Sequence, residues 1–275
     1  MFEIVQAIVL GFVQGATEFI PVSSSGHLVI VPWLLGWTFP SLLFDTVLHW
    51  GTLVSILLVF WRDLWTIAVA TLVSLARRSL ADPMARLGWF IVVGTIPAMI
   101  TGLLLKDPIE ALFGSPLAAA GFLLVTAVLL AGSEQLARRR IPTDTLTTLR
   151  WPQVIIIGLA QAIALAPGIS RSGSTMAAGL GSGLRREDAA RFSFLLGTPA
   201  FFGAGLLQLG DAMAANSSTV AAQIPTLVVG FLVSALVGFV AIRGLLAYLR
   251  RRSLNAFAVY CVVVGFLVIA FNLFG

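Results

Sequence analysis

Long apolar runs dominate this sequence, and they restrict its fold more than any other feature. Several windows of about 20 predominantly apolar residues follow one another, which is the length that an α-helix needs to cross a bilayer. Only 11% of the 275 residues are charged, whereas water-soluble domains carry roughly a quarter. The hydrophobicity comes in long runs rather than in alternation, which argues against a porin-like barrel. The sequence therefore predicts an all-α polytopic membrane protein.

Six apolar segments are long enough to be full spans, and four are shorter or interrupted by Pro, Gly and Ser. The predicted spans are 42–60, 86–105, 116–137, 188–209, 224–247 and 255–274. The short segments are 4–20, 25–37, 153–166 and 172–183. Short broken segments at matching places in two halves point to a midplane site made of broken helices. We therefore expect two re-entrant helix hairpins, at 4–37 and 153–183.

The two halves of the chain match each other at an offset of 147 residues. The identities pair Gly11 with Gly158, Gln14 with Gln161, Ser23 with Ser170, Ser25 with Ser172, and Gly26 with Gly173. Each half then holds one hairpin and three spans, and an odd number of spans inverts the second half. We predict an inverted-topology repeat within one integrated membrane domain. Its parts are a first repeat at 1–137, a cytoplasmic linker at 138–152, a second repeat at 153–275 and an outer loop at 210–222.

The basic residues test this topology. Fifteen of the 17 fall on one side of it, and they are Arg62, Arg77, Arg78, Arg86, Arg138, Arg139, Arg140, Arg150, Arg185, Arg186, Arg191, Arg243, Arg250, Arg251 and Arg252. By the positive-inside rule this side is cytoplasmic, which puts both termini and the mouth of the first hairpin outside. The net charge of +5 thus reflects anchors at the membrane edge, and we expect no nucleic-acid partner.

Two further observations concern the N-terminus and the single cysteine. The first thirty residues lack a basic n-region and contain Glu18, so we expect the N-terminus to be retained rather than cleaved as a signal. The single cysteine, Cys261, lies in an apolar run, so the sequence offers no disulfide framework and no cysteine-based metal site.

Polar residues concentrate in the first broken segment. An ionisable group at bilayer depth costs several kcal/mol or more, so Glu18 is a functional candidate by default. Gln14 lies four residues before Glu18 on the same helix face, and Pro21 ends that helix. Three serines, Gly26 and His27 follow, and the serines can cap the next helix, whose free N–H groups attract anions. The serines are Ser23, Ser24 and Ser25.

The second broken segment adds a guanidinium to this inventory. Pro167 and Gly168 break the chain, and Arg171 offers a fork of donors suited to bidentate phosphate binding. Small and hydroxylated residues surround the arginine: Ser170, Ser172, Gly173, Ser174 and Thr175. An arginine at this depth needs a counter-ion, which Glu18 or an anionic ligand would supply. Together the two hairpins suit a phosphate or diphosphate at the head of a lipid.

Both motifs resemble the signatures of the undecaprenyl-diphosphate phosphatase family of the integral-membrane, bacitracin-resistance type. The residues that carry the resemblance are Gln14-x-x-x-Glu18, Pro21-Val-Ser-Ser-Ser-Gly-His27 and Pro167-Gly-Ile-Ser-Arg-Ser-Gly-Ser-Thr175. The resemblance covers essentially the whole chain. It implies hydrolysis of undecaprenyl (polyprenyl) diphosphate to the monophosphate and inorganic phosphate, which recycles the carrier for cell-wall synthesis in the bacterial inner membrane. It also implies an active site that opens to the outer face.

The resemblance makes Glu18, Ser24, His27 and Arg171 the expected core of the site. Ser170, Ser172 and Thr175 would surround the phosphate, together with Gln14, Ser23, Ser25, Gly26, Gly173 and Ser174. A divalent cation, Mg²⁺ or Ca²⁺, would be held mainly by Glu18 and the diphosphate, because one carboxylate plus phosphate oxygens meets its demand for oxygen ligands. Family members carry Glu or Gln at position 14, and Gln14 here replaces a possible metal carboxylate with an amide.

Several assignments stay open from the sequence. The attacking group is Ser24, His27 or an activated water. His49 either lines the same cavity or forms a structural pair with Asp45, four residues away. The rival to the hydrolase is a transporter or flippase of a polyprenyl phosphate or small anion; a membrane scaffold explains neither Glu18 nor Arg171. The repeat is asymmetric, since Leu165 and Ser174 stand opposite Glu18 and His27, and this favours an enzyme. A homodimer is a candidate assembly.

Overall fold

The computed structural model describes residues 2–38, 41–215 and 217–274, and this part of the chain is built from α-helices. The short helices of the first half are α1 (Phe2–Phe19), α2 (Ser24–Leu34) and α5 (Lys106–Leu112), and those of the second half are α7 (Trp151–Ile163) and α8 (Arg171–Gly181). The long helices are α3 (Leu42–Arg77), α4 (Pro83–Leu104), α6 (Pro116–Arg139), α9 (Arg186–Ala215), α10 (Ser217–Leu249) and α11 (Asn255–Phe274).

Six helices in the described part of the chain are long and apolar enough to cross a membrane. They are α3, α4, α6, residues Arg186–Leu207 of α9, residues Gln223–Leu249 of α10, and α11. Each overlaps one of the six segments predicted as spans, so the all-α polytopic membrane fold is confirmed. The four predicted short segments correspond to α1, α2, α7 and α8.

The structure corrects two boundaries. Helix α3 does not stop near residue 60 but continues to Arg77, with a local break at Phe60 where φ is −109° and ψ is 19°. It continues because no Pro or Gly occurs between Gly51 and Pro83. The outer loop predicted at 210–222 is wrong in extent, since α9 runs to Ala215 and α10 begins at Ser217. The alanines that suggested a loop are the strongest helix formers.

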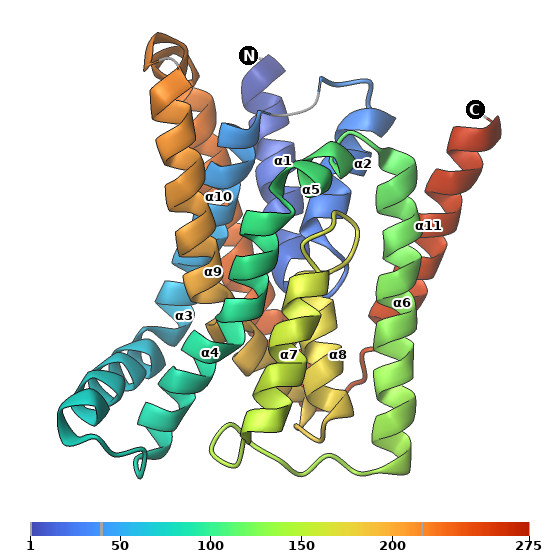
Figure 1. Ribbon diagram of the computed structural model, residues 1–275. Helices are drawn as coiled ribbons and strands as arrows, with labels where there is room; N and C mark the ends of the chain where they lie inside the picture. The colour runs from blue at the N-terminus through green and yellow to red at the C-terminus, as the bar shows by residue number, and fades with distance from the viewer. Residues whose placement is uncertain (1, 39–40, 216, 275) are drawn as a thin grey trace.

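Figure 1 shows how the two short helix pairs are arranged. The N- and C-termini lie at one end of the helical bundle, and the connections from α3 to α4 and from α6 to α7 lie at the opposite end. Helix α1 begins, and α2 ends, at the end that holds the termini, whereas α7 begins and α8 ends at the other. The two pairs therefore enter the bundle from opposite ends and turn inside it.

Each pair is packed against a helix from the other half of the chain. Helix α1 packs along α10, and α7 packs along α4. The contacts are close: a Cβ on Gly11 would lie 2.7 Å from the carbonyl oxygen of Gly230, and a Cβ on Gly158 would lie 2.6 Å from that of Gly94. Gly11 and Gly158 are 147 residues apart, which is the predicted offset of the repeat.

The linker between the halves is docked rather than free. It runs between α6 and α7, as predicted for 138–152. Asp144 donates its N–H to the carbonyl of Gly183 at 3.0 Å and accepts from the N–H of Arg185 at 3.0 Å. The linker thereby fixes the segment between α8 and α9.

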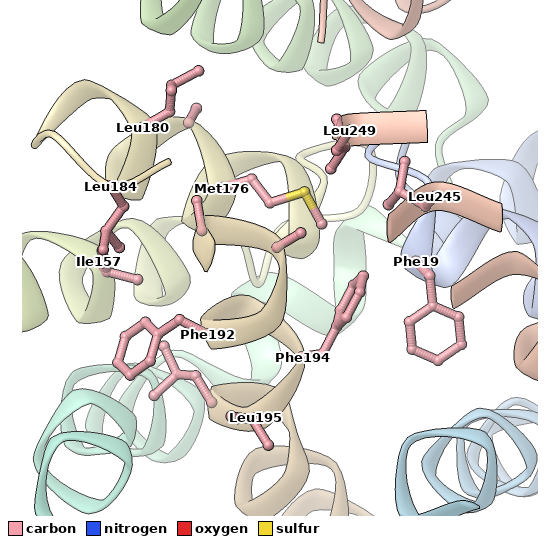
Figure 2. Packing of buried hydrophobic residues seen from close by; sticks show 14 of the residues in the cluster. Phe19, Ile157, Met176, Leu180, Leu184, Phe192, Phe194, Leu195, Leu245 and Leu249 are labelled. Carbon is pink, nitrogen blue, oxygen red and sulfur yellow. The ribbon is translucent and has the colours of Figure 1, made fainter. Parts of the chain in front are cut away.

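A core of large apolar side chains holds the turn of the first pair in place. Phe19, at the end of α1, is fully buried and meets the ring of Phe194 edge-on, with centroids 5.2 Å apart. Figure 2 shows these rings with Leu245 and Met176, which come from α10 and α8. Because Phe19 follows Glu18 directly, the same packing fixes the position of the Glu18 carboxylate.

Candidate active site at the junction of two broken helices

The first break in the chain forms as its sequence predicts. Helix α1 ends at Phe19, two residues before Pro21, and Ser23 is the N-cap of α2, accepting a hydrogen bond from the N–H of Gly26 at 3.2 Å. Ser23 has φ of +70°, a conformation that non-glycine residues rarely adopt and that stores strain. The surrounding residues therefore hold Ser23 in this strained conformation.

The second break uses a glycine instead. Gly168 has φ of +102°, and Ser170 is the N-cap of α8, accepting from the N–H of Gly173 at 3.0 Å. The hydroxyl of Thr126, on α6, donates to the Gly168 carbonyl at 3.0 Å and accepts from the Ser170 N–H at 2.9 Å. A neighbouring full-length helix thus fixes this turn.

The two breaks touch each other inside the bundle. The Ser23 hydroxyl accepts a hydrogen bond from the N–H of Gly168 at 3.1 Å. A Cβ on Gly26 would lie 3.0 Å from the Cα of Gly168, so the backbones are at their limit of approach. The N-termini of α2 and α8 therefore meet at one place.

Glu18 is the centre of a buried hydrogen-bond cluster at this place. One of its carboxylate oxygens accepts from the Ser24 hydroxyl at 2.5 Å and from the Gln14 amide at 3.0 Å. The other oxygen accepts from the Arg171 guanidinium at 3.1 Å. The Glu18 side chain is only 4% exposed, so the arginine supplies the compensating charge that a buried carboxylate needs. The structure thus brings together four of the predicted residues.

Arg171 is held by contacts on both sides. It donates a second hydrogen bond, 3.1 Å long, to the carbonyl of Ser193 on α9, and its guanidinium lies 4.4 Å from the ring centroid of Phe201. The Thr175 hydroxyl donates to the Arg171 carbonyl at 2.8 Å and lies 2.6 Å from the Ser193 hydroxyl. The guanidinium plane is therefore fixed beside Glu18, and its Nε is buried without a partner in the described structure.

His27 points away from this cluster. Its Nδ1 lies 2.7 Å from the carbonyl of Ser23, and its Nε2 lies 2.8 Å from the hydroxyl of Tyr260 on α11. Both ring nitrogens of His27 are therefore engaged by groups other than Ser24 and Glu18.

The other histidine faces the carboxylate instead. His49 Nε2 lies 3.6 Å from a Glu18 oxygen, and the His49 side chain is 25% exposed. Its Nδ1 lies 2.8 Å from the backbone carbonyl of Asp45, not from the Asp45 carboxylate. Of the two alternatives for His49, the structure supports the one that places it at the site.

The remaining predicted residues form the walls of the two turns. Ser170 and Ser172 have their hydroxyl oxygens 3.3 Å apart, as have Ser23 and Ser25. Ser174 is buried and its hydroxyl has no partner among the described residues. The same holds for the side-chain oxygen of Gln14.

Comparisons with known proteins identify the family of the chain. The family described as bacitracin resistance protein BacA matches residues 7–267. The chain belongs to this family. It is 44% identical over 279 residues to an undecaprenyl-diphosphatase of Methanosphaera stadtmanae, with 98% of each chain covered. The corresponding protein of Chloroherpeton thalassium is 42% identical, with 98% of this chain and 96% of that one covered. That of Rubrobacter xylanophilus is 44% identical, with 98% of each covered.

In this member of the BacA family, sequence reasoning missed the partners that come from distant spans. Ser193, Phe201, Thr126 and Tyr260 all touch predicted site residues, yet each lies inside an apolar helix. Local sequence carries no signal for such contacts, because they depend on which helices pack together. Ser193, Thr126 and Tyr260 are marked by composition, because each carries a hydroxyl within an apolar span.

Proposed function

We propose that the chain is an undecaprenyl-diphosphatase, a membrane hydrolase that cleaves undecaprenyl diphosphate to the monophosphate and inorganic phosphate. The observation that carries the proposal is the buried contact among Glu18, Ser24 and Arg171 where two helix N-termini meet. Full-length relatives with that name support it. A diphosphate is an anion that helix N-termini and a guanidinium bind well.

Ser24 is the nucleophile in this proposal, and Glu18 is its base. A reactive hydroxyl needs a base within hydrogen-bond reach and a third group that orients the base. Ser24, Glu18 and Arg171 meet both conditions. The Ser24 oxygen attacks the terminal phosphorus, its proton passes to Glu18, and the bond from that phosphorus to the bridging oxygen breaks. Water then hydrolyses the phosphate ester on Ser24.

Arg171 stabilises the charge of the transferring group. Phosphoryl transfer depends mostly on positioning and on donors aimed at the equatorial oxygens. The ring of Phe201 and the carbonyl of Ser193 hold the guanidinium in one orientation. We assign phosphate contacts to the hydroxyls of Ser170, Ser172, Ser174 and Thr175 and to the N-terminal turns at Ser23, Ser25, Gly26 and Gly173.

A divalent cation, Mg²⁺ or Ca²⁺, belongs to the proposal as cofactor. The residues present fit it, because the Gln14 oxygen is buried without a partner beside the Glu18 carboxylate, and hard cations take oxygen ligands. The described residues hold no cluster of three or more His, Cys, Asp or Glu side chains. Substrate phosphates would therefore complete the coordination. When bound, the cation would neutralise charge on the diphosphate.

The proposed setting is a bacterial inner membrane, with both termini and the active-site mouth on the outer side. The placement of 15 of the 17 basic residues at the opposite end supports this orientation. The inverted repeat and its re-entrant hairpins are part of the proposal. The opposed entry of α1–α2 and α7–α8 and the matching glycine contacts support them. A homodimer stays a prediction.

Transport of a polyprenyl phosphate is the weaker alternative. A hydrolase needs one reacting face, whereas a pure transporter could function with near-symmetric donors. Leu165 occupies the position in the second repeat that Glu18 occupies in the first. The base therefore exists on one side of the pseudo-symmetric site only, which suits a reaction on one phosphate.

Phosphate release by the purified protein tests the proposed function. We expect release of inorganic phosphate from C55 or C15 prenyl diphosphate in the presence of Mg²⁺ or Ca²⁺, its loss in EDTA, and its recovery when the cation is restored. A wild-type protein that is folded and supplied with cation but releases no phosphate would overturn the hydrolase assignment. Full activity in EDTA would overturn the cofactor alone.

A further inference from the structure

The turn that carries Ser24 is strained, and His27 helps to hold it. Ser23 has φ of +70° and ψ of 96°, a strained conformation that persists only where the surrounding structure enforces it. Its carbonyl accepts from the backbone N–H of His27 at 3.2 Å and lies 2.7 Å from His27 Nδ1. The His27 imidazole therefore adds a side-chain hydrogen bond to the backbone hydrogen bond of the first turn of α2.

This contact fixes the tautomer of His27. A carbonyl oxygen only accepts, so Nδ1 must carry a proton and donate it to Ser23. In the neutral ring, Nε2 then holds a lone pair and needs a donor. The hydroxyl of Tyr260 lies 2.8 Å from Nε2, and the two rings stack with centroids 5.7 Å apart and planes 16° apart. Tyr260 is thus the donor that suits this tautomer.

The position of Tyr260 is itself fixed by packing. The next residue, Cys261, is fully buried in a cluster with Val29 and Ile30 of α2 and with side chains of α6. Gly265, one turn further along α11, sits where a Cβ would be 3.0 Å from the carbonyl oxygen of Ala120. Helix α11 therefore presents the Tyr260 hydroxyl to His27 in one register.

We propose that Tyr260 is a positioning residue for the hydrolase: by holding His27 in the Nδ1–H tautomer, it stabilises the strained Ser23 turn that places the Ser24 hydroxyl on Glu18. This inference rests on the proposed function of the site. The Tyr260 hydroxyl both donates and accepts, so it stays bonded to His27 in either protonation state of the ring. Tyr260 is 42% exposed, which places it between the buried imidazole and the surroundings.

The chain offers matched variants for the test, because it contains two tyrosines and two histidines. Tyr260→Phe removes the hydroxyl and keeps the ring. Tyr248→Phe is the control, since the Tyr248 ring contacts that of Phe257 at an interplanar angle of 58° and is not part of the site. We expect Tyr260→Phe to lower kcat by about tenfold or more, because a misplaced reacting group can cost up to about 10²-fold in rate, with KM nearly unchanged. Tyr248→Phe should keep kcat within about twofold of wild type.

A spectroscopic measurement separates this role from general loss of structure. The protein is prepared with ¹⁵N-labelled imidazoles and with His49→Gln, so that the remaining histidine signals come from His27. We expect a protonated Nδ1 and an unprotonated, hydrogen-bonded Nε2 for His27. In Tyr260→Phe the Nε2 resonance should shift toward that of a free nitrogen and the tautomers should mix, while Tyr248→Phe leaves both signals in place.

A double-variant cycle completes the test. If Tyr260 acts through His27, adding Tyr260→Phe to His27→Ala should cause little further loss of residual activity. An equal loss in both backgrounds would overturn the inference, and so would a Tyr260→Phe protein whose His27 resonances or whose kcat match those of Tyr248→Phe. A wild type without phosphatase activity would instead refute the proposed function, and the ¹⁵N signals would still decide whether Tyr260 sets the tautomer.

Discussion

At the scale of single residues, the site depends on one carboxylate that serves several partners. Glu18 accepts from Ser24, Gln14 and Arg171 and faces His49 at 3.6 Å. Ser24 and Gln14 share one oxygen and Arg171 has the other. The oxygen that accepts from Ser24 also faces His49, whereas the Arg171 ion pair is made by the other oxygen.

Ser24→Ala tests the assignment of the nucleophile. We expect kcat to fall by about 10²–10⁴-fold, as when a positioned nucleophile and its base are separated, because water would have to attack in place of the serine. Phosphate release at saturating substrate measures it. Ser133→Ala is the matched control, since Ser133 is also a buried serine but donates to the Leu130 carbonyl of its own helix.

Equal activity of the two serine variants would return the attacking role to water or to His27. A large loss confined to Ser24→Ala, with both proteins unfolding at similar temperatures, would support Ser24.

At the scale of helices, the site exists because α1 and α7 end inside the bundle. Gly168 makes the second stop possible: its φ of +102° disfavours any side chain, and a Cβ there would meet the Ala119 carbonyl and lie 2.7 Å from the Cβ of Phe122. The same residue donates its N–H to Ser23. One glycine therefore sets the distance between the two turns.

We expect Gly168→Ala to destabilise the protein by about 1–3 kcal/mol, the cost of a strained backbone position, and to lower kcat together with stability. Thermal unfolding in detergent and phosphate release measure the two effects. Gly132→Ala on α6 is the control, because a Cβ there has open space and alanine favours a helix. A Gly168→Ala protein as stable and active as wild type would show that this turn tolerates a side chain.

How much of the site is predictable follows from the distances involved. The pairing of Gln14 with Glu18 and the capping by Ser23 and Ser170 are contacts within a few residues, so the sequence predicts them. The orientation of His27 is not predictable, because its partner is 233 residues away on α11.

The fold also has parts that the sequence predicts and parts that it does not. The spans follow from apolar length. The continuation of α3 past Phe60 was missed because Arg62 and Asp63 interrupt its apolar sequence, and the short helix α5 was missed because three of its seven residues are charged. The prediction of a loop at 210–222 was wrong because alanine, which is frequent there, has the highest helix propensity of all residues.

At the scale of the whole molecule, orientation in the membrane decides which compartment supplies the substrate. In single-cysteine proteins, residues 106–112 should react with an impermeant maleimide added outside intact cells, and residues 138–144 should react only after the membrane is opened. The native Cys261 is fully buried and should contribute little label, and Cys261→Ser gives a clean background. The reverse labelling pattern would invert the topology and move the active-site mouth to the cytoplasm.

The interlocking of the two halves also has a consequence for how the protein is made. Glu18 lies on α1, which leaves the ribosome before α8, and its counter-ion Arg171 follows 153 residues later. At synthesis rates of about 5–20 residues per second, that is an interval of roughly 8–30 s. Helix α10, on which α1 packs, emerges later still. Until the second half of the chain has been inserted, the Glu18 carboxylate therefore lacks its counter-ion and α1 lacks its packing partner. A chain that ends before α8 never acquires them.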